Sequence, residues 1–144
     1  MPQVVRSALV QHSAEAMYQL VNDVEHYPEF LPGCTETKIV SESAQQMRAS
    51  VLIAKSGISQ WFTTDNSLEP GKSITMQLVN GPFSQLSGGW TFTPLAEDAC
   101  KVELNLDFEF SNKIVAMAFG KVFSSIASKM VDAFVQRAGE VYCD

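Results

Sequence analysis

The sequence predicts an α+β fold in which a curved antiparallel sheet of about seven strands closes around one long C-terminal helix. Three observations predict it. Segments with a period of two follow one another from residue 34 to residue 110. The stretch Cys100 to Phe110 alternates strictly between apolar and polar residues, as in a strand with one dry and one wet face. The last apolar-periodic stretch runs from Ser111 or Asn112, either of which can cap it, to Tyr142. At 1.5 Å per residue this helix is about 45 Å long.

The N-terminal segment predicts one strand and then two short helical pieces. The strand ends at Val10, and Ser13 follows as a candidate N-cap for a helix. Apolar residues then recur at i, i+3, i+4 and i+7, which describes one buried helical face: Met17, Leu20, Val21 and Val24. The helical pattern stops near Tyr27-Pro28, because proline disfavours helical geometry in the residue before it.

The central segment predicts strands separated by turns. The strands before Cys100–Phe110 are expected over 37–40, 47–53, 58–63, 74–78 and 83–94. Turns are expected at 43–46, at 69–72 and at Asn80-Gly81, a strong hairpin signal. Gly88-Gly89 predicts a bulge or a tight bend inside its strand. The length of 144 residues fits one domain, residues 1–144.

An apolar space is expected between the helix and the sheet. The helix must cover its apolar stripe with the dry face of a sheet that twists and curls, and such a pair tends to leave space between its layers. The pattern offers these large side chains to that space: Trp61, Trp90, Phe92, Phe108, Phe119, Phe123, Met130 and Phe134. A stripe of this kind is equally typical of a plain core, so a ligand pocket and a filled core both remain open.

Composition and charge narrow the class of partner. The formal net charge of −6 disfavours nucleic acid, and DNA is not an expected partner. No apolar run reaches the ~18 residues of a membrane span, and the N-terminus lacks a signal-peptide core, so a cytoplasmic protein is expected. Three cysteines without a C-x-x-C motif make a disulfide framework improbable, and two histidines cannot build a histidine-rich metal site.

Catalysis is not the expected function, and no catalytic residue is assigned. The carboxylates of the last strand fall on its wet face: Glu103, Asp107 and Glu109. The best remaining acid–base or metal-binding cluster lies at a helix end, where charged residues are ordinary surface: Asp23, Glu25, His26 and Glu29. Cys34 would need a nearby base to act as a nucleophile.

Basic residues recur along the last helix at intervals of eight: Lys113, Lys121, Lys129 and Arg137. At ~100° per residue each step drifts by about 80°, so the four together spiral and form no single basic stripe. RNA contact therefore gets little support from this pattern.

Several blocks of the chain resemble a known family. They are residues 18–24, 27–34, 81–83, 90–94 and 108–110, together with Leu86. These blocks resemble the coenzyme-Q-binding branch of the START-like, polyketide-cyclase-like superfamily, and within it the bacterial RatA group. The resemblance implies a helix-grip fold over nearly the whole chain.

The resemblance implies two activities. The leading interpretation is non-catalytic binding of a hydrophobic isoprenoid ligand, ubiquinone or a polyprenyl relative, in the cavity between sheet and helix, in support of respiration. The alternative is a toxin of the RatA type that binds the large ribosomal subunit and blocks its association with the small subunit. A contact with a ribosomal protein would suit the acidic surface better than a contact with RNA.

The resemblance also implies positions for the candidate ligand-binding residues. Tyr27, Pro28, Phe30, Leu31 and Pro32 would shape a loop at the mouth of the cavity. The sheet wall would include Phe83, Trp90 and Phe92, and the helix wall Phe119 and Phe123. Transient membrane contact through Phe30 and Leu31 is one expectation, and closure of the core by the same two residues is the other.

Overall fold

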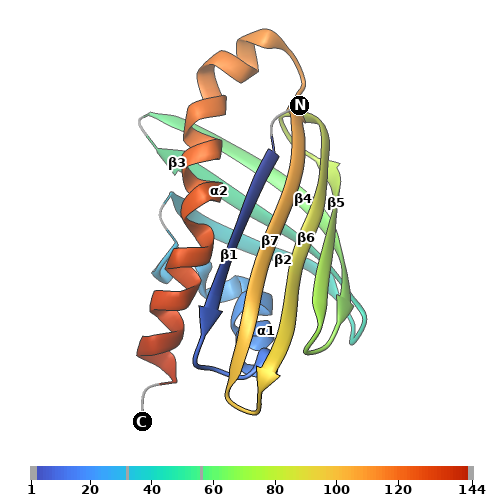
Figure 1. The fold of residues 1–144 in the computed structure, drawn as a ribbon. Coiled ribbons are helices and arrows are strands. Elements are labelled where there is room, and N and C mark those ends of the chain that lie inside the picture. Colours follow the sequence, from blue (N-terminus) through green and yellow to red (C-terminus); the bar gives the residue numbers. More distant parts are fainter. Residues whose placement is uncertain (1–2, 32, 56, 143–144) are drawn as a thin grey trace.

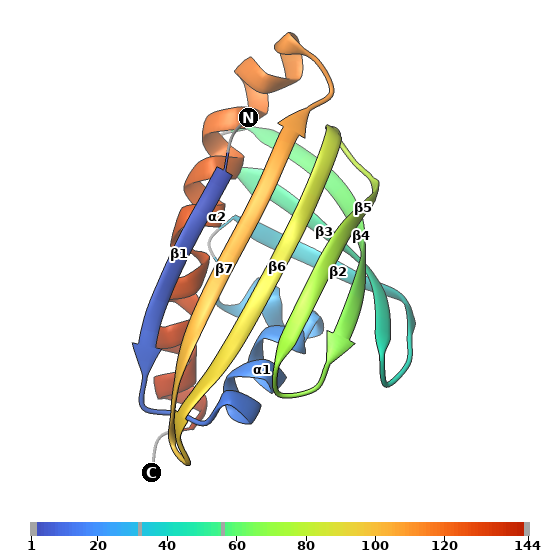
Figure 2. The ribbon, with the colours of Figure 1, turned by 45° about the vertical axis from the view of Figure 1, so that its right-hand side comes forward.

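Seven antiparallel strands form one sheet that curves around a long helix, as expected (Figures 1 and 2). The computed structural model describes residues 3–31, 33–55 and 57–142. The strands are β1 (Gln3–Val10), β2 (Cys34–Glu42), β3 (Gln46–Lys55), β4 (Ile58–Glu69), β5 (Ser73–Asn80), β6 (Phe83–Ala96) and β7 (Ala99–Phe110). The helices are α1 (Ala14–Asn22), the 3₁₀ helix η1 (Val24–Glu29) and α2 (Lys113–Val141). The strand order β1-β7-β6-β5-β4-β3-β2 places the first strand beside the last.

The helix ends follow from local side-chain chemistry. The Ser13 side chain accepts a hydrogen bond from the Ala16 amide at 3.0 Å and begins α1. Asn112, one of the two expected caps, accepts from the Val115 amide at 2.9 Å and begins α2. The first helix ends at Asn22, earlier than the apolar period suggests, and the chain continues as η1 with Pro28 inside it.

The core lies between the concave face of the sheet and α2. On β7 the buried residues alternate as predicted: Cys100, Val102, Leu104, Leu106 and Phe108. The buried face of α2 consists of Phe119, Phe123, Ile126, Ala127, Val131, Phe134 and Ala138. By length and composition alone α2 could cross a membrane. The sequence pattern predicts no membrane span because the lysines of this helix interrupt every continuous apolar run. In the structure its buried face packs against the sheet.

Gly88 and Gly89 adopt a role that differs from the expected bulge. The pairing of β6 with β7 runs through both glycines without a change of register, and its irregularities lie nearer the ends of the strand. Gly88 has φ +133°, and a Cβ added there would lie 2.0 Å from the carbonyl oxygen of Asn105 on β7. The glycines therefore permit a conformation and a close strand approach that no side chain tolerates.

Replacing Gly88 by alanine tests this constraint. We expect Gly88→Ala to lower the free energy of unfolding by about 3 kcal/mol or more, because the positive φ and the backbone clash cannot both be relieved. Urea unfolding followed by circular dichroism measures the loss. The matched control is Gly139→Ala in the exposed part of α2, where a Cβ meets nothing within 4 Å. The control should leave stability unchanged or raise it by up to about 1 kcal/mol. Equal effects of the two changes would contradict the assignment.

Candidate functional site

A small apolar cavity lies between the sheet and α2. Its volume is about 80 Å³. From η1, the following loop and the first strands it is lined by Val24, Tyr27, Leu31, Cys34, Ala49, Val51, Ile53, Phe62, Thr64 and Asn66. From the later strands and α2 it is lined by Met76, Leu86, Trp90, Leu104, Leu106, Phe123, Ile126, Ala127 and Met130. This volume holds about two or three water molecules. It is far smaller than the ~300 Å³ of the smallest ordinary ligand pockets.

Two polar side chains of β4 face this apolar space. Thr64 and Asn66 are the buried polar residues of the described part of the chain. The Thr64 hydroxyl donates a hydrogen bond to Oδ1 of Asn66 at 2.9 Å. Because a polar group in an apolar interior costs free energy unless it is partnered, each side chain offsets part of the cost of burying the other.

Aromatic rings fill the interior next to the cavity. The aromatic cluster, as we call it below, consists of Phe62, Phe83, Phe108, Phe110, Phe119 and Phe123. The ring centroid of Phe123 lies 4.9 Å from those of both Phe83 and Phe108. Edge-to-face pairs of this kind are favourable beyond the area they bury. The space that the sequence offered to a ligand is therefore largely occupied by side chains.

Only some of the predicted site residues meet at the cavity. The cavity is lined by Tyr27, Leu31, Trp90, Phe123 and Met130. The other buried members lie outside its lining, with Phe83, Phe108 and Phe119 in the aromatic cluster and Phe92 packed against Tyr18 of α1 at 6.0 Å. Binding of a ligand by any of them stays a prediction.

The placement of Trp61 toward the cavity is wrong. Its side chain is 43% exposed, and the neighbouring Phe62 lines the cavity instead. Adjacent strand residues point to opposite faces, so only one of two consecutive aromatic residues can face inward. The inward-facing residues of β4 continue with Thr64 and Asn66. Because these two side chains are polar, the sequence pattern did not reveal which face of the strand is buried. Counting back in steps of two from the buried Leu68 would have identified Phe62.

Phe30 and Leu31, in the loop after η1, close the core. Of the two expectations for these residues, the structure favours core closure over membrane insertion. Leu31 is only 5% exposed. The half-buried Phe30 ring packs 5.2 Å from that of Phe134, and the guanidinium of Arg137 lies 5.1 Å above its centroid. Phe30 does not line the cavity. Pro28 is exposed, and Pro32 lies outside the described residues.

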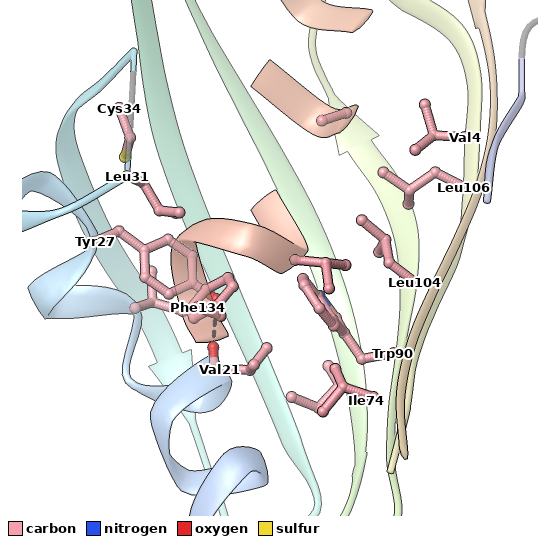
Figure 3. Close-up of a cluster of buried hydrophobic side chains, with 14 of the residues drawn as sticks. Val4, Val21, Tyr27, Leu31, Cys34, Ile74, Trp90, Leu104, Leu106 and Phe134 are labelled. Carbon is pink, nitrogen blue, oxygen red and sulfur yellow. Dashed lines mark hydrogen bonds between the residues drawn. The ribbon is translucent and has the colours of Figure 1, made fainter. Parts of the chain in front are cut away.

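Tyr27 and Cys34 are the titratable groups in the cavity wall. The Tyr27 hydroxyl donates to the carbonyl oxygen of Val21 at the end of α1 (Figure 3). Burial raises the pKa of Tyr27 far above its usual value, so the phenol stays protonated. Burial also raises the pKa of the Cys34 thiol to about 11, and its Sγ lies 4.0 Å from the Glu36 carbonyl oxygen. A neutral thiol is a poor nucleophile.

The charged cluster of the first helices is a set of surface ion pairs. His26 Nδ1 lies 2.6 Å from Asp23 Oδ2, and Arg137 on α2 donates to Oε1 of Glu29 at 2.9 Å. The hydrogen bond that His26 donates to the Asp23 carboxylate, followed by the negative charge of Asp23, raises the pKa of His26. The carboxylates of β7 do not line the cavity either. Among the described residues no group of three or more histidine, cysteine, aspartate or glutamate side chains could hold a metal ion.

A curved sheet of seven antiparallel strands that grips one long helix over an apolar interior defines the START-like, helix-grip class of protein. A START superfamily protein from Mycobacterium smegmatis has the same fold, with a TM-score of 0.80 and 21% identity over 96% of this chain and 98% of that one. The chain belongs to the polyketide cyclase / dehydrase and lipid transport family, whose model matches residues 10–135.

Two relatives differ in how much of the sequence they share with this chain. The ribosome association toxin RatA of Vibrio cholerae is 59% identical over 142 residues, which covers 99% of both chains. The mitochondrial coenzyme Q-binding protein COQ10 homolog B of Xenopus laevis is 26% identical and covers 94% of this chain but 57% of its own length. The chain is therefore much more similar to RatA than to the coenzyme Q-binding relative.

Replacing Tyr27 by phenylalanine tests the hydroxyl that joins η1 to α1. We expect Tyr27→Phe to lower the free energy of unfolding by about 1–2 kcal/mol, because the Val21 carbonyl loses a buried partner. Tyr142→Phe is the matched control, since its half-buried hydroxyl also donates to a carbonyl oxygen, that of Ala16 at 2.9 Å, and should cost less. Urea unfolding compares the two variants. A loss at Tyr27 no larger than that at Tyr142 would contradict this role.

Proposed function

We propose that this protein binds the large ribosomal subunit and hinders its association with the small subunit. The observation that supports it best is the end-to-end match with RatA, at 59% identity over 99% of both chains. An end-to-end match at this level of identity supports a partner in common with that relative. The filled interior agrees with a protein that acts through its surface. A cytoplasmic location, where ribosomes work, is part of the proposal.

The mode of action that we propose is binding without catalysis. The family description includes cyclases and dehydrases, so the fold alone does not decide the matter. The titratable side chains in the described cavity wall are a protonated phenol and a high-pKa thiol. General acid–base chemistry works best with groups that titrate near the operating pH, and neither of these does.

A second candidate function is non-catalytic binding of an isoprenoid quinone in the cavity. The apolar lining and the inward-facing pair Thr64 and Asn66 favour it, since a quinone offers a polar head and an apolar tail. The volume of about 80 Å³ opposes it, because a prenylated ring would have to displace core side chains. We therefore place it after the ribosomal proposal.

Sucrose-gradient sedimentation tests the ribosomal proposal. Purified subunits are mixed with the protein, and magnesium is then raised to the level at which they join. We expect the joined peak to fall and the protein to sediment with the large subunit. Protein unfolded by heat serves as the control and should leave the joined peak unchanged. An unchanged profile with the protein in about tenfold molar excess, and no sedimentation with either subunit, would exclude this function.

Solvent extraction of the purified protein tests the order of the two candidates. We expect well under one quinone per chain, about 0.1 or less, since a site of this volume is far below ordinary ligand pockets. Absorbance and mass measurement of the extract give the ratio. A quinone present at one per chain would reverse the order. In that case Phe123→Asp should release it, provided that the variant keeps the circular dichroism spectrum of the folded protein.

A further inference from the structure

The first turns of α2 expose large apolar side chains. Ile114 and Met117 are 79% and 85% exposed, the highest values among the large apolar residues of the described chain. No residue from Lys113 to Ala118 is buried, and the buried face of the helix begins at Phe119. In both views this end of the helix, drawn in orange, extends beyond the ends of the strands (Figures 1 and 2). The sheet ends before it can cover these side chains.

These apolar residues share one face of the helix with two lysines. At 100° per residue, Lys113, Met117 and Lys121 fall within an arc of about 80°, and Ile114 lies beside them. All four side chains are exposed. The buried Phe119 and Phe123 point to the other side of the helix. We call Lys113, Ile114, Met117 and Lys121 the α2 tip face.

The chain segment that carries the tip face has a charge opposite to that of the whole protein. No carboxylate occurs between Glu109 and Asp132, whereas Lys113, Lys121 and Lys129 all lie in that interval. These are three of the ten cations of the chain and none of its sixteen carboxylates, so the remaining chain holds seven cations against sixteen carboxylates. The segment from residue 110 to residue 131 is thus cationic in a chain that is acidic overall, and the exposed Glu109 at the end of β7 is the carboxylate nearest to it in the sequence.

We propose that the α2 tip face docks on a lipid bilayer that contains anionic headgroups. Ile114 and Met117 would enter the boundary between headgroups and acyl chains, while the lysine stems lie along the apolar layer and their ammonium groups reach lipid phosphates. A nucleic acid backbone would satisfy the lysines and leave the two aliphatic side chains without a matching surface. A projecting helix end can also approach a flat surface before the sheet touches it (Figure 2).

The acidic remainder of the protein does not prevent this docking. Charges more than about 8–10 Å from the bilayer are largely screened at physiological ionic strength. The 29 residues of α2 span about 44 Å, so the carboxylates beside its far end lie well outside that distance. Glu109, at the end of β7, is the carboxylate close to the tip in the sequence, and Lys113 and Lys121 outnumber it. Repulsion of the acidic portion would instead orient the molecule with the tip face toward the lipid. Two inserted side chains and two lysines support a weak, reversible attachment.

Flotation with lipid vesicles tests the proposal on the whole chain. We expect more wild-type protein to float with vesicles of phosphatidylcholine and phosphatidylglycerol than with phosphatidylcholine alone. Met117→Glu should lower the partition coefficient about tenfold or more, because an exposed carboxylate replaces an inserted apolar group. Lys113→Gln combined with Lys121→Gln should remove the preference for anionic vesicles. Leu95→Glu is the matched control, since Leu95 is 58% exposed near the opposite end of the sheet, and it should float like wild type.

The same variants separate this proposal from the ribosomal one. Met117→Glu should hinder subunit joining as well as wild type does, because the lipid contact is a separate activity. Equal flotation of wild type with neutral and anionic vesicles, or flotation of Met117→Glu equal to that of wild type, would overturn the lipid proposal. Loss of the ribosomal effect in Met117→Glu with unchanged flotation would overturn it too and assign the tip face to the ribosome. If the wild-type protein floats as expected but does not hinder subunit joining on the sucrose gradient, only the ribosomal proposal is contradicted.

Discussion

The contact between Phe123 of α2 and the phenylalanines of β4, β6 and β7 is the interaction on which the rest of the structure depends. Phe123 meets Phe62, Phe83 and Phe108 at centroid distances of 4.9 to 6.0 Å. Each ring buries about 150–250 Å², so this cluster ranks among the larger sources of stability in the chain. This packing sets the position of α2 along the sheet. The cluster thereby explains two features at once: the interior beside it is filled, and the turns that precede Phe119 extend past the strands.

A second aromatic group closes the opposite side of the cavity. Phe134 packs against Trp90 and Tyr27 at 5.2 and 5.4 Å, and Phe92 contacts Tyr18 of α1. The small cavity lies between these two groups. A long ligand would have to displace one of them, and removing a buried aromatic side chain costs about 3–5 kcal/mol. The free energy of binding would have to offset that cost before any affinity remained, which is why we give the surface precedence over the cavity.

The fold could be predicted from the sequence because its determinants are local. The alternation of β7, the Asn80-Gly81 turn and the caps at Ser13 and Asn112 each involve neighbouring residues. The site was harder to predict because polar residues interrupt the apolar pattern. Trp61 and Phe62 are both aromatic, and the polar side chains of Thr64 and Asn66 obscure the inward-facing register of β4 that selects Phe62. Met117 belongs to an apolar stretch that reads as core until the end of the sheet is known, so its exposure could not be derived from the helix alone.

The family fold does not specify a function, since the same sheet and helix can surround a reaction, a ligand or a packed core. What distinguishes this chain is where its polar and apolar groups depart from the expected pattern. Thr64 and Asn66 are polar and face inward, and they share a hydrogen bond that offsets part of the cost of burial. Ile114 and Met117 are apolar and face outward, and no described residue covers them. A folded chain lowers its free energy by covering apolar surface, so the uncovered pair gains most from an external partner. The cost of burying Thr64 and Asn66 is offset within the molecule by their hydrogen bond. The cost of exposing Ile114 and Met117 is offset only by contact with another surface.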